Sequence, residues 1–478
     1  MNSFGALLPL IVLVVGALLV LMLEVFLKKE NRDYLAYVSV LFLIGTITAC
    51  VSFWNKSLYY FGGYLSLDKM ALFFSVLLCI ATIFVILISI KYITLQDINF
   101  GEYYALLLLA LSGMFIMVSS QNLLVIFLGL EVLSMSSYAL AGMKRNDPLS
   151  VEAAVKYFLL GSFASAFLVF GIAFLYGATG TTDINIFIAF FQSESTMGLT
   201  ALIGLGMILI GFGFKIAIVP FHMWTPDVYQ GAPTPITAFF SVGPKVVGFV
   251  VLLRIFYPYW KVVLDSQVIF TLLWVLSVLT MVIGNLIALR QTNVKRILAY
   301  SSIAHAGYLI IAILSQDSSS LVFYLTVYAF MNIGAFTAVI ALGKKDKEYL
   351  ELDDYAGIGF KYPWIGATLM IFLFSLAGFP PTGGFLAKFY VFSSAVRQGL
   401  DSLVIIAVLA SLISVFYYLR IIIYMYMKDP TKNIDIHIEN PALFLVMFLC
   451  LYFVLQLGIF PRNVLALINQ AVQSLPLF

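Results

Sequence analysis

Five ionisable residues lie where a membrane protein tolerates charge least. Glu131, Lys245 and His305 each fall near the middle of a long apolar stretch, and Lys215 and Lys388 lie beside clusters of glycine and proline. A charge at the bilayer centre costs at least ~2.5–3.5 kcal/mol, so such a group is expected to face a partner or a water-filled cavity. Proton conduction is the chemistry that fits these groups. A structural ion pair is the alternative, because snorkelling does not suit a central glutamate.

The composition excludes a soluble protein. Of 478 residues, 63% are hydrophobic and 10% are charged, and the mean hydropathy is +1.06. A globular domain carries roughly a quarter charged residues. The net charge of +3 is too small to indicate nucleic acid or a strongly acidic partner. The aromatic share of 16% is expected mainly at lipid contacts and interfacial belts.

The cysteines and histidines provide no pattern for a metal or cluster site. Cys50, Cys79 and Cys450 each stand alone in an apolar stretch, and the three histidines lack metal-ligand spacing. Iron–sulfur clusters, structural zinc and disulfides need clustered or matched thiols. We therefore expect this chain to bind no cofactor and no metal, and electrons to travel elsewhere.

Apolar stretches of about 20 residues, the length that crosses a bilayer, predict an all-α polytopic membrane protein with about fourteen transmembrane helices. The first stretch is longer than the core of a signal peptide and lacks a small-residue cleavage site. The predicted spans lie near residues 5–27, 34–54, 69–90, 103–119, 122–142, 150–178, 198–219, 235–257, 267–289, 294–314, 319–342, 363–395, 402–427 and 440–460.

Positive charge follows odd-numbered spans. Short loops rich in lysine and arginine stay in the cytoplasm, and such loops follow the first, fifth, ninth and eleventh spans. They contain Lys28, Lys29, Arg32, Lys144, Arg145, Arg290, Lys295, Arg296, Lys344, Lys345 and Lys347. Both termini are therefore expected outside the cytoplasm. The N-terminus does not resemble a transit peptide, which favours a bacterial inner membrane.

Two predicted spans are interrupted. Residues 198–231 contain Lys215 followed by prolines, and residues 363–395 contain Lys388 preceded by prolines and glycines. A discontinuous helix in each half is typical of transporters built from inverted repeats. We expect spans four to eight to be repeated, inverted, by spans nine to thirteen. The predicted segments are an N-terminal three-helix segment (1–100), two five-helix half-channel repeats (101–260 and 261–428) and a C-terminal helix (429–478).

Several other residues have structural interpretations. Arg254 and Arg420 lie near the ends of their spans and are expected to extend toward the headgroups. Gly204 and Gly211 belong to a glycine-rich apolar helix that no strand precedes. Close helix packing is therefore expected there, not nucleotide binding.

Three motifs resemble a known family. They are GLEVLSMSSY at residues 129–138, FHMWTPDVYQGAP at 221–233 and KRILAYSSIAHAGY at 295–308. Over nearly the whole chain, the sequence is similar to the antiporter-like membrane subunits of respiratory complex I, the bacterial NADH:quinone oxidoreductase. The resemblance implies two inverted five-helix half-channels within a bundle of about fourteen helices.

The resemblance also implies a proton relay. Glu131, Lys215, Lys245, His305 and Lys388 match the family's relay residues. A Glu131–Lys215 ion pair would hold the lysine protonated, and its separation would release a proton toward Lys245, His305 and Lys388. Changes in neighbouring subunits, driven by quinone reduction, would open and close the pair.

Three residues are candidate accessory members of this relay. His222 belongs to the motif after the first break. Lys156 matches a lysine of the family's sixth helix, and anchoring at the membrane interface is an equal alternative. Asp227 would either feed protons into the site or satisfy the loop backbone.

The resemblance implies a proton translocase subunit without a redox centre. The assembly would use NADH, FMN, iron–sulfur clusters and quinone in other subunits. Partners would be other membrane-arm subunits, including antiporter-like paralogues, and the lipid bilayer, without nucleic acid. The alternatives are a subunit of a multisubunit cation/proton antiporter, which shares these motifs, and a scaffold of the membrane arm.

Overall fold

The structure, a computed structural model, describes residues 5–56, 58–60, 64–187, 198–257, 267–343, 348–430 and 440–475. The helices up to residue 256 are η1 (Gly5–Leu7), α1 (Leu8–Phe26), η2 (Lys29–Asn31), α2 (Asp33–Ser52), α3 (Lys69–Leu95), α4 (Gly101–Ser119), α5 (Leu123–Ala141), α6 (Pro148–Thr179), α8 (Leu199–Ile216), α9 (Trp224–Gly231) and α10 (Thr234–Phe256). Those that follow are α12 (Gln267–Ala288), α13 (Val294–Leu314), α14 (Ser318–Ala341), η5 (Leu352–Tyr355), α15 (Ile358–Lys361), α16 (Pro363–Ala377), α17 (Gly383–Arg397), α18 (Asp401–Met427), α19 (Pro441–Ile459) and α20 (Arg462–Val472). Strands β1 (Leu58–Tyr60) and β2 (Leu65–Leu67) form an antiparallel hairpin with Leu58 opposite Leu67.

The helix lengths confirm a polytopic membrane protein. Within the described residues, 13 helices are long and apolar enough to cross a membrane. The shorter apolar helix α16 is continued by α17 after a break, and the two together supply one more crossing. This agrees with the predicted count of about fourteen spans.

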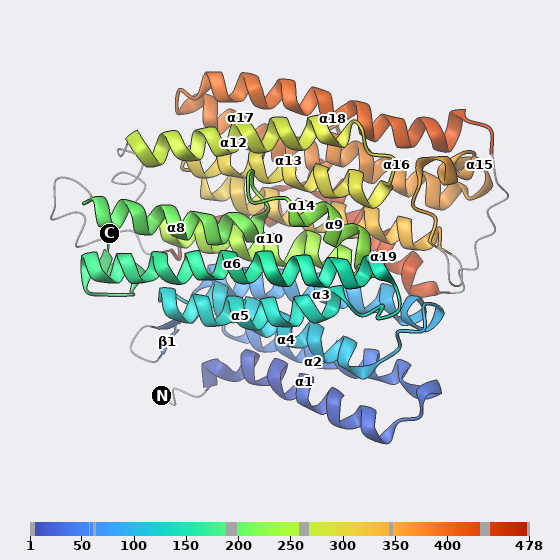
Figure 1. Cartoon of the computed structure of the whole chain (residues 1–478), viewed down its shortest axis with the longest axis horizontal. Coiled ribbons are helices and arrows are strands. Elements are labelled where there is room, and N and C mark those ends of the chain that lie inside the picture. The colour runs from blue at the N-terminus through green and yellow to red at the C-terminus, as the bar shows by residue number, and fades with distance from the viewer. Residues whose placement is uncertain are drawn as a thin grey trace.

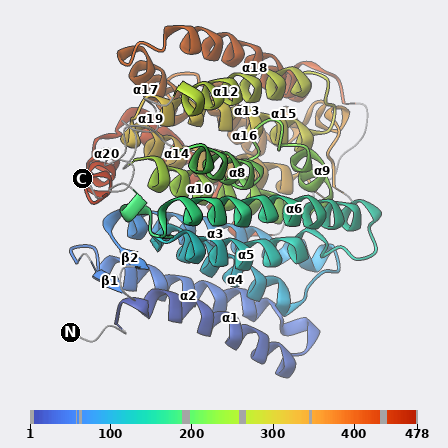
Figure 2. The same cartoon turned by 60° about the vertical axis from the view of Figure 1, so that its left-hand side comes forward.

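The helices lie roughly side by side, and the chain progresses across the bundle. α1 and α2 lie at one side, α12 and α18 at the other, and both chain ends lie at the same end of the bundle (Figures 1 and 2). α19 returns from the far side to pack on α14 and α3. In each of α10, α13 and α14, an apolar stretch of 18 residues is entirely buried inside the protein. These three helices therefore form the core.

Among the described helices, six α-helices begin with a side-chain cap. Helix starts leave backbone N–H groups without partners, and lipid cannot satisfy them. An aspartate or asparagine accepts from such an N–H at the start of α3, α5, α6, α13, α14 and α19; the capping residues are Asp68, Asn122, Asp147, Asn293, Asp317 and Asn440. These caps fix where each helix starts.

The first predicted break separates α8 from α9. The residue that caps the C-terminal end of α8 is Ala217, which adopts the left-handed conformation with φ 60°. The break frees carbonyl groups at the end of α8, and Trp224 of α9 donates from Nε1 to the Phe214 oxygen at 2.8 Å. Val219 N–H donates to Thr280 Oγ1 at 3.0 Å. The discontinuity is thus stabilised by protein groups, as a break within a bilayer requires.

The second break separates α16 from α17, and hydrogen bonds from protein groups stabilise it as well. The residue that caps the C-terminal end of α16 is Gly378, with φ 93°, a left-handed conformation that glycine adopts without strain. Lys388 Nζ reaches back from α17 to the carbonyl oxygen of Ala377 at 2.8 Å. Gly384 N–H donates to Ser375 Oγ at 3.2 Å. Both predicted discontinuous helices are therefore present.

The prediction is wrong for Arg254. This residue is 3% exposed and makes a two-pronged ion pair with Asp68, with both N–O distances 2.8 Å. The guanidinium group is therefore held inside the protein. Arg420 donates to the carbonyl oxygens of Leu289 and Gln291 in the connection after α12, so its side chain extends toward the end of the span.

The predicted close helix packing at Gly204 and Gly211 is confirmed where α8 packs against α6. An added Cβ on Gly204 of α8 would lie 3.0 Å from the carbonyl oxygen of Gly171 in α6. A Cβ on Gly211 would lie 2.7 Å from Leu168 Cβ. Small residues let these two helices approach closely, as is common in membranes.

The C-terminal segment contains more than the single predicted helix. α19 crosses the bundle, and the short helix α20 follows it. Lys344, Lys345 and Lys347, which contributed to the predicted orientation, lie outside the described residues.

Candidate functional site

Lys215 occupies an aromatic cage at the end of α8. The residue is 2% exposed. Its Nζ lies 5.4 Å from the ring centroid of Tyr138, 5.2 Å from that of Tyr157 and 5.9 Å from that of Phe214. No hydrogen-bond acceptor in the described part of the chain reaches this nitrogen. Aromatic faces attract an ammonium without accepting its proton, so the cage holds Lys215 in place and leaves its protons unshared.

Glu131 lies at the middle of α5 and faces α6. The residue is partly exposed, and Ser165 of α6 donates from Oγ to Glu131 Oε1 at 2.6 Å. The predicted Glu131–Lys215 ion pair is not among the ion pairs of the described residues. The physical reason is that Tyr138, seven residues along α5 from Glu131, covers the lysine.

Lys245 lies at the middle of the core helix α10. It is 1% exposed, and its Nζ donates to the carbonyl oxygen of Ser302 in α13. The hydroxyl of Ser302 lies 3.4 Å from the hydroxyl of Tyr229 in α9. Lys245 is therefore joined to the neighbourhood of the first break through α13.

His305 lies on α13, about one turn beyond Ser302. Its Nδ1 is 2.6 Å from the hydroxyl of Tyr324 in α14, and its Nε2 is 3.3 Å from the hydroxyl of Tyr418 in α18. Tyr418 also hydrogen-bonds Ser301. Both ring nitrogens thus have a hydroxyl that can donate or accept, which is the environment of a group that passes protons in either direction.

Lys388 lies beyond the second break and is 5% exposed. Besides the Ala377 carbonyl, its Nζ contacts Ser411 Oγ of α18 at 2.8 Å and lies 5.2 Å from the ring centroid of Tyr308. Asn285 of α12 donates from Nδ2 to the Tyr308 hydroxyl at 3.2 Å. A second set of hydroxyl and amide groups therefore surrounds Lys388.

Buried tyrosines form the part of this site that sequence reasoning missed. Within the described residues, the fully buried large side chains include Tyr229, Tyr308, Tyr324, Tyr328, Tyr417 and Tyr418. The expectation that aromatic residues mainly contact lipid is wrong for these six. The available signal was the spacing of Tyr324 and Tyr328, four apart in one span, which places both hydroxyls on one helix face.

The accessory residues form a separate cluster beside the first break. Asp227 accepts from Lys156 at 2.6 Å and from Arg296 at 2.8 Å, and Lys156 also pairs with Glu152 at 2.7 Å. Burial opposes ionisation of Asp227, but the hydrogen bonds and charges of Lys156 and Arg296 outweigh it and lower the Asp227 pKa. The Asp227 carboxylate thus binds two cations and not the loop backbone, and its role in feeding protons into the site stays a prediction.

His222 does not join that cluster. The residue lies between α8 and α9, and its Nδ1 has no hydrogen-bond partner within the described residues. Its carbonyl oxygen accepts from Thr225 N–H at 3.0 Å and so starts α9. The structure therefore gives His222 a backbone contact at the break and leaves the Nδ1 of its ring without a partner among the described residues.

Glu348 is an additional buried acid that no motif indicated. It lies in the connection after α14 and accepts from Tyr92 at 2.9 Å, from Thr234 and from Lys144 at 3.1 Å. Burial alone would raise its pKa, but Lys295, Lys144 and these hydrogen bonds outweigh it and lower the pKa to about 2. Glu348 is thus an anion that ties α3, α10 and the loop after α5 together.

Glu348→Gln should destabilise the protein at neutral pH by about 1–3 kcal/mol, because Lys144 and Lys295 lose their shared anion. A carboxyl whose pKa is lowered from 4.5 to about 2 stabilises the fold above pH 4.5, and this contribution disappears as the pH falls toward 2. Thermal unfolding of the purified protein across this window measures the loss. The Gln variant should lack that pH-dependent component, and exposed Glu30→Gln should retain it. Equal pH profiles for wild type and Glu348→Gln would contradict this account.

Comparisons with known proteins identify the family of this chain. Residues 120–414 match the family described as NADH:quinone oxidoreductase/Mrp antiporter, transmembrane. The NADH-quinone oxidoreductase subunit N of Trichlorobacter lovleyi is 42% identical, covering 98% of this chain and 97% of the relative.

Solved structures of related membrane complexes contain similar chains. A chain of respiratory complex I from Thermus thermophilus is 32% identical, with a TM-score of 0.82 over 96% of this chain and 98% of that one. A chain of the Mrp complex from Dietzia has a TM-score of 0.85 at 21% identity, over 99% of this chain and 98% of that chain, and this likeness concerns the fold alone. The chain therefore belongs to the antiporter-like family of membrane subunits, as a member of the subunit N group of NADH-quinone oxidoreductases.

Proposed function

We propose that the chain conducts protons as a non-redox, membrane-arm subunit of a bacterial NADH-quinone oxidoreductase. The observation that carries this proposal is the set of buried groups in the core. Lys245, His305 and Lys388 are at most 5% exposed, and each contacts serine or tyrosine groups on neighbouring helices. Titratable groups at this depth mark ion and proton pathways in membrane proteins.

The proposed relay runs from Glu131 and Lys215 through Lys245 and His305 to Lys388. Because Lys215 lies in an aromatic cage, a movement of Tyr138 or Glu131 would decide whether a carboxylate or a ring faces its ammonium. The cluster of Lys156, Asp227 and Arg296 lies beside the first break and would organise proton uptake there, with His222 available to exchange. Quinone reduction in other subunits would drive these changes.

The surrounding organisation supports this role. In our proposal NADH, FMN, iron–sulfur clusters and quinone are bound by other subunits, and neighbouring antiporter-like subunits flank this chain. Both termini would lie outside the cytoplasm of a bacterial cell, in keeping with their position at one end of the bundle (Figure 1). The two broken helices support two inverted half-channels, residues 101–260 and 261–428.

Glu131→Gln tests the relay because glutamine preserves the hydrogen bond to Ser165 and removes only the titratable charge. We expect the reconstituted assembly to lose proton pumping by about tenfold while it still assembles, which is less than the ~100-fold or more that a positioned proton-transfer group typically contributes. A pH-sensitive dye inside proteoliposomes measures pumping during NADH oxidation.

The control for this test is Ser165→Ala, which removes the hydrogen bond and keeps the carboxylate. It should pump nearly as well as the wild type. Wild-type pumping by Glu131→Gln would reject Glu131 as a proton carrier and leave it a structural role. The antiporter alternative is tested separately by purifying the native complex, because flavin- and iron–sulfur-containing subunits should accompany this chain.

A further inference from the structure

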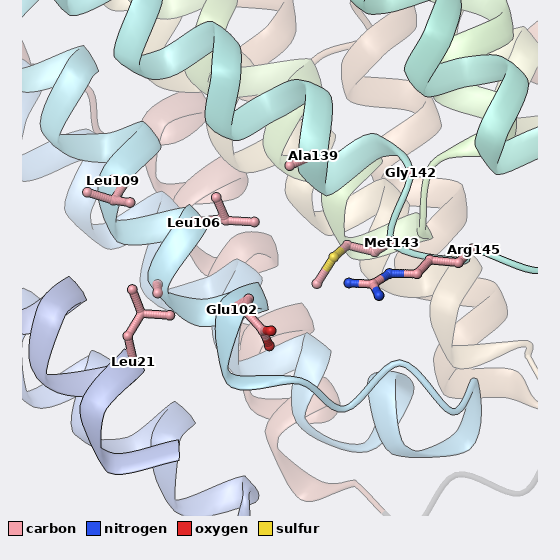
Figure 3. A pocket seen from close by; sticks show the side chains of 9 residues that line it. Leu21, Glu102, Leu106, Leu109, Ala139, Gly142, Met143 and Arg145 are labelled. Carbon is pink, nitrogen blue, oxygen red and sulfur yellow. The ribbon is translucent and has the colours of Figure 1, made fainter. Parts of the chain in front are cut away.

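An apolar groove opens between α1, α4 and the end of α5. Its volume is about 480 Å³, and its apolar wall includes Leu21, Leu106, Leu109 and Ala139. Glu102 of α4 and Arg145, which follows α5, enter its mouth from opposite sides and extend toward one another (Figure 3). The groove is therefore apolar along its length and dipolar at its mouth.

The two charged residues lie at the depth of lipid headgroups. Glu102 is the second residue of α4, and Arg145 lies four residues beyond the end of α5, so both mark the end of a membrane-spanning helix. Leu106 and Leu109 lie roughly 6–10 Å further along α4 at 1.5 Å per residue, within the acyl-chain region. Charge at the mouth and apolar lining below match the two parts of a phospholipid.

Neighbouring charges are already paired, whereas these two are not. Lys29 pairs with Asp97 at 2.8 Å, and Arg32 pairs with Glu24 at 3.3 Å. Among the described residues, the side chains of Glu102 and Arg145 form neither an ion pair nor a hydrogen bond; the Arg145 guanidinium lies 5.5 Å from the ring centroid of Phe100. One free anion and one free cation thus face the same opening.

We propose that this groove binds phosphatidylethanolamine. Arg145 would bind the phosphate, Glu102 would accept hydrogen bonds from the ammonium, and an acyl chain would lie along Leu106 and Leu109. Phosphatidylcholine has no N–H to donate to Glu102, and phosphatidylglycerol offers no cation to it. The site therefore selects a zwitterionic headgroup with a primary amine, and this selection does not depend on proton movement through the relay.

The test uses the intact assembly in nanodiscs and a phosphatidylethanolamine that carries a photoreactive group in its acyl chain. Peptides of α1, α4 and α5 should be labelled. Unlabelled phosphatidylethanolamine should compete about threefold to fivefold better than phosphatidylcholine or phosphatidylglycerol, the range available to an exposed charge pair. Glu102→Gln should abolish this preference, and Arg145→Gln should weaken both labelling by the photoreactive phosphatidylethanolamine and competition by each unlabelled phospholipid. Glu30→Gln, which removes an exposed carboxylate outside the groove, should match the wild type.

Three results would overturn the proposal. Equal competition by all three lipids would show a nonselective apolar surface. Stronger competition by phosphatidylglycerol would show an anion site. An absence of labelling in the wild-type assembly would show that a neighbouring subunit covers the groove. Assembly of each variant is checked first by co-purification, so that lost labelling is not confused with lost folding.

Discussion

Lys388→Gln should lower proton pumping by the reconstituted assembly by about a hundredfold, the low end of what a positioned proton-transfer group contributes. Glutamine keeps an N–H donor that can approach the Ala377 carbonyl and Ser411, which the lysine now contacts at 2.8 Å each. The substitution thus preserves much of the structure at the second break and removes the group that exchanges a proton. Dye-detected proton uptake, normalised to the amount of assembled complex, measures the effect.

Two companion variants separate proton transfer from charge and position. Lys388→Arg keeps a cation that does not deprotonate in proteins, so it should pump as poorly as Lys388→Gln. Lys428→Gln removes a lysine at the end of α18 that lies over the ring of Tyr424, and it should pump normally. Normal pumping by both Lys388 variants would remove Lys388 from the relay.

Arg254→Met should destabilise the protein by about 3–5 kcal/mol, the cost of leaving one partner of a buried ion pair unpaired. The Arg254 and Asp68 side chains are each 2% exposed, and the pair joins the end of α10 to the start of α3. Asp68 also caps α3 by accepting from Ala71 N–H at 2.7 Å. Loss of the arginine therefore leaves a buried carboxylate at a helix start, and the thermal unfolding midpoint of the purified complex should fall.

The double variant Asp68→Asn and Arg254→Met provides the control. Asparagine is uncharged and still caps the helix, so the double variant should recover much of the stability lost by Arg254→Met alone. Asp97→Asn breaks the exposed pair with Lys29, whose side chains are 65% and 80% exposed, and should leave the midpoint unchanged. An Arg254→Met midpoint equal to that of Asp97→Asn would mean that the buried pair contributes no more than a surface pair.

The sequence was sufficient to place the membrane-spanning helices and both breaks. Membrane thickness fixes the length of an apolar stretch, and prolines and glycines interrupt helices through their own backbone geometry. Both are local properties, so α8 and α16 end near the predicted interruptions. The depth of Glu131, Lys245 and His305 follows from the same count of residues along each span.

The partners of the ionisable side chains follow from the packing of the helices and are not visible in the sequence. Glu131 bonds Ser165 instead of pairing with Lys215, Arg254 bonds Asp68 186 positions away, and His305 contacts Tyr418 113 positions away. Apolar patterning determines that a helix enters the membrane, but nearly every face of a core helix such as α13 is apolar, so the pattern does not indicate which face meets which neighbour. That choice depends on side-chain shape and hydrogen bonds between helices distant in sequence. The identity of the titratable groups was therefore encoded locally, and their partners were set by packing.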